Sequence, residues 1–464
     1  MPNGDVHVFM PPSPTETERG GIKAKPKTTE TVEVTIGEDG KLYVPKCVEV
    51  EEFDDAVKTS LTNSEADPWT SEEQSAAQNL LGVTDKFNAV NILLNGLTTT
   101  KQQPEYLSQL ADSGMFGEVY NAGDQFITTW TDTQASKTYE YPFRLNHIGD
   151  VELEDGTLLT KRPYLQAHYA HPFGVQFSHQ RAFLRCPDGL SAGTYYFTIE
   201  TKWGGNVSAG DVVCFTLTKD IPVGGRLSGC YGAPDQNKSN WRIYSHSADG
   251  KTILETVIPT FEANGIDLGI QKNNSRNGDL NSTQEMAYGW NRWSKSALRQ
   301  YLNSDAGVGE WWTAQDEWDI APDQLIQKAG FLTGLPSDLL SVMKTVKVIT
   351  YANTVNDGGV EDVTYDKVFI PSLEQIFVTP QIAGEGEYHE YWKKRSGSAN
   401  SLAQYSTNTN MITYAVENHT SPQRVRLRSA YRGYAYDTWY VFSSGFVGSD
   451  CAINAYRFSP LIII

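Results

Sequence analysis

The most informative stretch of this 464-residue chain is its C-terminal segment, Arg428–Ile464, RSAYRGYAYDTWYVFSSGFVGSDCAINAYRFSPLIII. Nine aromatic residues stand between positions 431 and 458, interleaved with glycine, serine and alanine. A strand would alternate polar and apolar residues and a helix would repeat every 3.6 residues, but this segment keeps neither period over its length. Large amphipathic rings separated by small residues are typical of recognition loops. The segment predicts a binding face, and the alternative is a tyrosine-rich irregular piece of core.

This segment resembles the variable region of proteins diversified by retroelements, which have a C-type lectin fold. In that family a fixed framework brackets positions that change. The framework would be Arg428, Ser429, Ala430, Arg432, Ala435, Trp439, Val441, Gly445, Val447, Ala452, Ala455, Arg457, Phe458 and Pro460. The variable, ligand-binding positions would be Tyr431, Gly433, Tyr434, Tyr436, Asp437, Tyr440, Phe442, Ser443, Ser444, Phe446, Gly448, Ser449, Asp450, Cys451, Ile453, Asn454 and Tyr456.

The genetic code offers a check on this partition. Randomising both adenines of an AAC or AAT codon yields residues such as Tyr, Ser, Gly or Asp, but never Lys, Glu, Gln, Met or Trp. All seventeen variable positions satisfy that restriction. Moreover, no Lys, Glu, Gln or Met occurs anywhere from Ser429 to Ile464, although Lys and Glu are common earlier in the chain.

The resemblance extends upstream through shorter motifs. The segments 293–304, 366–373 and 391–392 are similar to the scaffold of that lectin-like family in gut phages and their hosts. The segments 20–24, 36–45 and 69–74 resemble attachment regions of phage tail proteins. The resemblance implies a bacterial surface ligand, a virion tail or baseplate as attachment partner, and a homotrimer.

The pattern of residues along the chain predicts four parts. These are a tail and hairpin over 1–50, short helices of a stalk over 51–118, an all-β sandwich over 119–225, and an α+β domain over 226–464, which the resemblance identifies as C-type lectin-like with its variable region at 429–460. The hairpin is expected from the alternation in 32–36 and the apolar residues 42–44, and a sandwich strand from 194–199. Helices are expected over 70–82, from Pro104 to Gly114, over 290–302 with Ser294 as cap, and after Pro336. Further strands are expected at 213–217, 347–350 and 367–370.

Charge and composition narrow the class of partner. The formal net charge of -18 would repel phosphate backbones and acidic membranes, so nucleic acid is not expected as a partner. No apolar run is long enough to cross a bilayer, and the N-terminus has no basic run followed by an apolar stretch, so neither membrane insertion nor an ordinary secretion signal is expected. The five cysteines are widely spaced and odd in number, which favours free thiols over a disulfide framework, although a single bridge stays open.

Two catalytic or metal-binding interpretations compete with the binding face. His147, His168, His171 and His179 lie close in sequence and could offer metal ligands, but no fourth ligand stands at a matching spacing. Asp316, Glu317 and Asp319 lie beside tryptophans, as in a glycosidase groove, but acids at such positions are also ordinary surface residues. No metal, cofactor or catalytic residue is therefore assigned.

These observations together predict a non-enzymatic receptor-binding adhesin on a phage tail fibre or tail tip. One alternative is a carbohydrate-active tail enzyme or a relative of the sulfatase-modifying lectin-fold enzymes, although the C-terminal part lacks the close cysteine pair that the latter needs. Another alternative is a host-encoded adhesin of the same family on the bacterial surface.

Overall fold

The computed structural model describes residues 22–24, 32–36, 42–43, 104–198, 212–217, 219–228, 242–244, 267–268, 283–397 and 400–464. The chain divides into two units, 1–91 and 92–464. In the first unit, three strands pair antiparallel in chain order: β1 (Ile22–Ala24), β2 (Val32–Ile36) and β3 (Leu42–Tyr43). The pairing of β2 with β3 confirms the predicted hairpin. The helix predicted over 70–82 lies outside the described residues.

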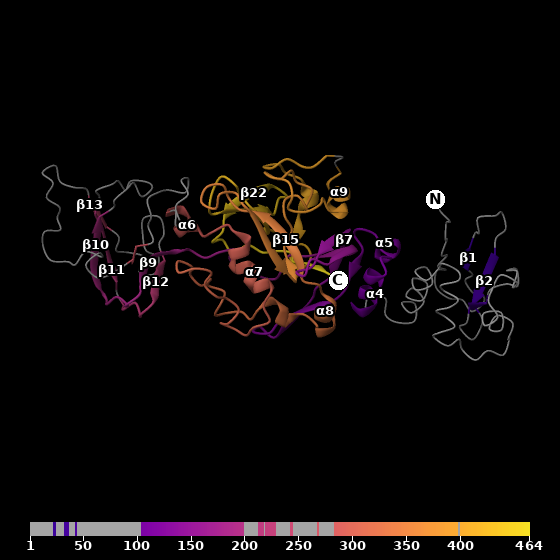
Figure 1. The fold of residues 1–464 in the computed structure, drawn as a ribbon, viewed down its shortest axis with the longest axis horizontal. Helices are drawn as coiled ribbons and strands as arrows, with labels where there is room; N and C mark the ends of the chain where they lie inside the picture. The colour runs from indigo at the N-terminus through magenta and orange to yellow at the C-terminus, as the bar shows by residue number, and fades with distance from the viewer. Residues whose placement is uncertain are drawn as a thin grey trace. The chain divides into compact units, whose positions relative to one another are not determined.

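The second unit is built on a five-stranded sheet that brings distant parts of the chain together. Its strand order is β17 (Val368–Phe369), β23 (Leu461–Ile463), β8 (Leu158–Ala167), β7 (Phe143–Glu152) and β4 (Gln125–Phe126). The last strand of the chain pairs with β8, where Leu461 lies opposite Gln166, so the C terminus lies beside the strands of the first third of the chain (Figure 1).

The sequence of β23 explains why it lies inside the sheet. Leu461, Ile462, Ile463 and Ile464 are all fully buried. A strand covered on both faces needs no alternation and is an unbroken apolar run, as here. Burying each such side chain contributes about 1.5–3 kcal/mol, so these four residues anchor the end of the chain to the core.

Helices cover this core. The helix α4 (Pro104–Asp112) packs on α8 (Ser337–Val342) and on β8, and its buried residues include Leu107 and Leu110. The short helix α5 (Phe116–Val119) follows it. The helices predicted after Pro104 and after Pro336 are therefore confirmed. Residues 104–118 do not form part of a separate stalk as predicted, because the apolar stripe of α4 is buried in the core of the second unit.

The other described helices and strands of this unit are mostly short. They are β5 (Thr129–Asp132), β6 (Lys137–Glu140), α6 (Thr283–Tyr288), η4 (Trp293–Lys295), α7 (Ala297–Leu302), η5 (Phe331–Gly334), β15 (Val346–Tyr351), β16 (Glu361–Asp366), α9 (Glu390–Ser396), η6 (Thr409–Met411), β18 (Thr413–Tyr414) and β19 (Pro422–Gln423). The strands expected at 347–350 and 367–370 are present as β15 and β17. Ser296 rather than Ser294 caps α7, because the Ser296 hydroxyl accepts the Arg299 N–H at 3.1 Å.

The chain does not divide at residue 225 as predicted. Two antiparallel sheets, β10-β11-β13 and β12-β9-β14, each combine strands from both sides of that position. Their strands are β9 (Ala182–Cys186), β10 (Gly193–Thr198), β11 (Val212–Leu217), β12 (Gly225–Ser228), β13 (Arg242–Tyr244) and β14 (Asp267–Leu268). The strand prediction for 194–199 and 213–217 is confirmed by β10 and β11, whereas the boundary fails because pairing partners follow in 242–268. Among the described residues, no helix is long and apolar enough to cross a bilayer.

Candidate functional site

The predicted variable region forms a three-stranded antiparallel sheet, β20 (Val425–Ala430), β21 (Asp437–Val441) and β22 (Val447–Cys451). Trp439 is fully buried on the central strand β21. Its indole lies in a hydrophobic cluster with Leu427, Val441 and Val447. The apolar framework residues therefore form the floor on which the rest of the segment lies.

Burial differs sharply between the framework positions and the variable positions. Eleven of the fourteen framework residues are buried: Arg428, Ser429, Ala430, Ala435, Trp439, Val441, Gly445, Val447, Ala452, Phe458 and Pro460. Of the seventeen variable positions only three are buried: Asp437, Tyr440 and Gly448. Most of the variable positions are thus at least partly accessible to another molecule, whereas most of the framework positions are not.

The strand pairing distributes the variable positions over both faces of the sheet, not over the single face that the sequence predicts. Trp439 pairs with Ser449 and Asp437 with Cys451, so these side chains share one face. Tyr440 pairs with Gly448, and neighbouring residues on a strand point to opposite faces, so Tyr440 lies on the second face.

On the first face, aromatic rings form a continuous row from Tyr288 to Tyr405. Tyr431 and Tyr434 stack at 5.0 Å between ring centroids, Tyr434 and Tyr436 stack at 5.3 Å, and Tyr436 lies 5.3 Å from Tyr288. Tyr431 and Tyr405 both pack on the buried ring of Trp439, at 5.6 and 5.1 Å. We call Tyr288, Tyr436, Tyr434, Tyr431 and Tyr405 the tyrosine row.

Two members of the tyrosine row, Tyr288 and Tyr405, lie outside the predicted site. Tyr405 is 52% exposed and takes a left-handed backbone conformation, with φ at 55°. Such a conformation is strained for a residue with a Cβ. No periodic pattern surrounds Tyr405 in the sequence, and only the folded structure places it here, where its backbone N–H donates to the Val447 carbonyl.

The second face carries a smaller aromatic and charged cluster. The exposed Arg424 guanidinium lies 4.0 Å from the ring centroid of Phe442, and it donates to the Tyr456 hydroxyl at 3.1 Å. Tyr456 packs against Tyr440 at 5.3 Å and donates its hydroxyl to Asp450. The polar groups of this face are therefore paired with one another.

Burial controls the protonation of the polar groups in the sheet. It raises the pKa of the Asp437 carboxyl to about 6, although the Ser449 hydroxyl bonded to it acts in the opposite direction. Burial also raises the pKa of the Cys451 thiol and of the Tyr456 hydroxyl, each to about 12. At neutral pH the tyrosine is therefore a neutral donor, and Cys451, a free cysteine, is not a reactive thiolate.

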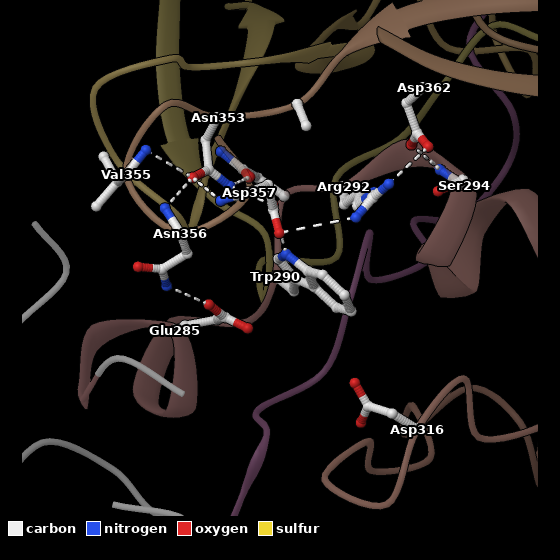
Figure 2. Close-up of polar contacts among 12 residues, drawn as sticks. Glu285, Trp290, Arg292, Ser294, Asp316, Asn353, Val355, Asn356, Asp357 and Asp362 are labelled. Atoms are coloured by element: carbon white, nitrogen blue, oxygen red, sulfur yellow. Dashed lines mark hydrogen bonds and ion pairs between the residues drawn. The ribbon is translucent and has the colours of Figure 1, made fainter. Parts of the chain in front are cut away.

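Polar side chains from α6 and from the 353–357 loop adjoin this sheet. Figure 2 shows the carboxylate of Asp357 meeting Trp290, whose Nε1 donates to Asp357 at 2.9 Å, and Glu285 accepting from the Asn356 amide at 2.7 Å. Glu285 also lies 3.0 Å from the Arg181 guanidinium, and both side chains are 2% exposed. Burial raises the pKa of the Glu285 carboxyl, with Arg181 acting in the opposite direction. This cluster holds the loop in place.

The four histidines considered as metal ligands have other partners, as two of them show. His171 is buried between the hydroxyls of Tyr141 and Tyr301, at 3.0 and 3.3 Å, while His147 pairs with Glu387 at 3.0 Å. Within the described part of the chain, no group of three or more His, Cys, Asp or Glu residues could hold a metal ion.

The acidic residues considered as a glycosidase groove also have partners. Asp316 binds Arg181 at 2.5 Å and accepts the Trp318 N–H at 2.9 Å, and Asp319 accepts the Gln315 N–H at 2.9 Å. Both carboxylates thus serve to hold this loop.

Comparison with known proteins gives one match. Residues 254–464 are similar to a protein family described as "Domain of unknown function (DUF6273)". The match contains all of β20, β21 and β22, and it begins in the segment that precedes α6. No curated protein and no solved structure matches the chain.

Proposed function

We propose that the chain is a receptor-binding adhesin that recognises a ligand on the bacterial surface through the tyrosine row and the variable positions around it. The observation that carries this proposal is the division of the C-terminal segment. Most of the framework residues are buried, while most of the positions inferred to vary are partly or fully exposed. A surface organised in this way can change its specificity without changing its core.

The chemistry of the tyrosine row supports recognition. A tyrosine combines a large ring with a hydroxyl and has only two side-chain torsions to fix, so it gives much contact area for little lost entropy. The rings are further restrained by stacking on one another and on Trp439. Such preorganisation lowers the entropic cost of binding.

The same proposal includes the remaining predictions about this protein. The variable region belongs to a C-type lectin-like domain of a retroelement-diversified protein, and the N-terminal unit attaches the chain to a phage tail fibre or tail tip. The chain acts as a homotrimer, and three identical binding surfaces would add avidity. A host-encoded adhesin on the bacterial surface would use the same surface in the same way.

The proposal is tested by binding of the fluorescently labelled full chain to a panel of gut bacterial isolates. The test variant replaces Tyr431, Tyr434 and Tyr436 with serine. The matched control replaces Leu158 and Ile326, which are 61% and 75% exposed and lie outside β20–β22, with serine. We expect the control to stain the same strains as the natural chain and the row variant to lose them.

Equal staining by the row variant and the natural chain would refute the proposed binding surface. Release of sugars from purified polysaccharide of a stained strain would show instead that the chain is an enzyme.

A further inference from the structure

The backbone of 431–437, which carries five variable positions, is gathered around one buried side chain. The carboxamide nitrogen of Asn291 lies 2.7 Å from the carbonyl oxygens of Tyr434 and Asp437 and 3.2 Å from that of Tyr431. The backbone N–H of Asn291 donates to the Ala435 carbonyl at 3.0 Å. Asn291 is fully buried. A single residue outside the variable region thus places its three N–H hydrogens among four carbonyl oxygens of the loop.

The carboxamide of Asn291 is held in one orientation by its neighbours. The Asn353 amide donates to the Asn291 Oδ1 at 2.9 Å and to Asp357 at 2.6 Å. Asp357 is fixed in turn by the Trp290 indole, as Figure 2 shows. If the Asn291 carboxamide were flipped, its oxygen would face three carbonyl oxygens and its nitrogen would face the donor of Asn353. The carboxamide N–H groups of Asn291 therefore point at the loop because a series of hydrogen bonds, from Trp290 to Asp357, from Asn353 to Asp357 and from Asn353 to Asn291, fixes the orientation of the carboxamide.

These bonds are independent of the variable side chains. All four acceptors on the loop are backbone carbonyls, which every residue has. Arg432, one of the two framework residues inside the loop, adds to them, because its guanidinium donates to the Ala352 carbonyl at 2.8 Å and the Thr354 N–H donates to the Arg432 carbonyl at 2.9 Å. Replacement of Tyr431, Tyr434 or Tyr436 would leave each of these bonds in place.

We propose that Asn291 is a positioning residue that fixes the backbone of 431–437 whatever side chains the loop displays. Its use as a device for presenting variable side chains rests on the function proposed above, but the positioning itself does not. A loop held in this way keeps its shape while its surface chemistry changes.

The test is hydrogen exchange of the full chain, followed by mass spectrometry of peptides that cover 431–437. The Asn291→Asp variant keeps the shape of the side chain but turns an oxygen toward the three carbonyls. We expect exchange in 431–437 to rise about tenfold or more, because buried acceptors lose their donor. A variant with serine at 431, 434 and 436 should show a smaller rise than Asn291→Asp.

The matched control is Asn303→Asp. The Asn303 carboxamide likewise donates to two backbone carbonyls, of Arg299 at 3.0 Å and Val368 at 2.8 Å, and accepts the N–H groups of Lys367 and Val368. It lies in another part of the fold, so Asn303→Asp should leave exchange in 431–437 unchanged.

A second readout separates positioning from a general loss of stability. The carboxyl introduced by Asn291→Asp regains one donor when it is protonated. The ratio of the exchange rate of 431–437 in this variant to that in the natural chain should therefore decrease as the pH is lowered from about 8 to about 5. Natural-like exchange of 431–437 in the folded Asn291→Asp variant at neutral pH would overturn the proposal.

Should Asn291→Asp not fold, Asn353→Ser provides the same test, because it removes the bond that orients Asn291, together with the contacts of Asn353 to Asp357 and to the backbone N–H groups of 355–357. A rise limited to 353–357 and 431–437 is then expected, and no rise in 431–437 would overturn the proposal. The exchange results stand whether or not the chain stains any bacterial isolate, so this inference and the proposed function fail separately.

Discussion

Replacement of Trp439 with alanine should be among the most destabilising changes in the variable region. Its ring is fully buried on the central strand β21 and supports Tyr405 and Tyr431 at 5.1 and 5.6 Å. Truncation of such a ring costs about 3–5 kcal/mol, because the lost transfer energy is joined by the cost of a cavity. The half-buried Tyr434 offers the comparison, since Tyr434→Ala loses two ring stacks of about 0.5–1.5 kcal/mol each.

The phenylalanine substitution refines this prediction. In the described part of the chain the Trp439 Nε1 has no hydrogen-bond partner, so Trp439→Phe removes a buried donor together with part of the ring. Because an unsatisfied buried donor costs about 1–3 kcal/mol, the loss of ring area is largely offset, and Trp439→Phe should cost about 1 kcal/mol or less.

Urea unfolding of the full chain measures these free energies. At a slope of about 3 kcal/mol per molar, Trp439→Ala should lower the midpoint of the transition by about 1 M, and Trp439→Phe should lower it only slightly. Exchange of peptides from 425–451 identifies the transition that belongs to this sheet. Equal shifts for Trp439→Ala and Tyr434→Ala would refute the division into a buried framework and an accessible surface.

Three further predictions follow from single groups. Arg181→Met should lower the free energy of unfolding in urea by about 3–5 kcal/mol, because it leaves the buried Glu285 carboxylate without its ion-pair partner. The double variant Arg181→Met/Glu285→Leu should lose less stability, and equal losses for the two variants would contradict this reasoning. Burial holds the pKa of His389 well below its usual value, so the imidazole takes up a proton only in the unfolded chain. As the pH is lowered from about 6.5, the free energy of unfolding should therefore decrease by up to about 1.4 kcal/mol per pH unit. His389→Phe should make this decline shallower, and an unchanged slope would contradict the assignment. Because φ is 55° at Tyr405, Tyr405→Gly should be about 1 kcal/mol more stable than Tyr405→Ala on thermal unfolding, and the reverse order would exclude backbone strain.

Local signals in the sequence account for the elements that could be predicted. The hairpin of β2 and β3 follows from alternation and a glycine-rich turn, and α4 from Pro104 at its start and the stripe that includes Leu107 and Leu110. These features depend on neighbouring residues only. The partition of the C-terminal segment rests instead on a resemblance, and the burial of Trp439 agrees with its place in the framework.

The parts of the fold and of the candidate site that the sequence does not predict depend on contacts between residues that are far apart in the chain. Nothing local to β8 indicates that Leu461 will lie opposite Gln166, so the sequence predicts a separate sandwich that includes 143–167. Asn291 is a single asparagine between Trp290 and Arg292, and its role becomes visible only when the carbonyls of 431–437 surround it. The two faces of the sheet depend on the register of β21 with β22, which the irregular spacing of aromatic residues conceals.

The central claim is that the accessible positions of the C-terminal segment are diversified, and the gene itself tests it most directly. Sequencing of the gene and its flanks should find a near-copy of the codons for 429–464 that carries adenines at the seventeen variable positions, next to a reverse-transcriptase gene. The framework codons should be the same in both copies. If the flanks contain no such repeat and related strains carry the same residues at those seventeen positions, the claim is contradicted, and only a tyrosine-rich binding surface remains.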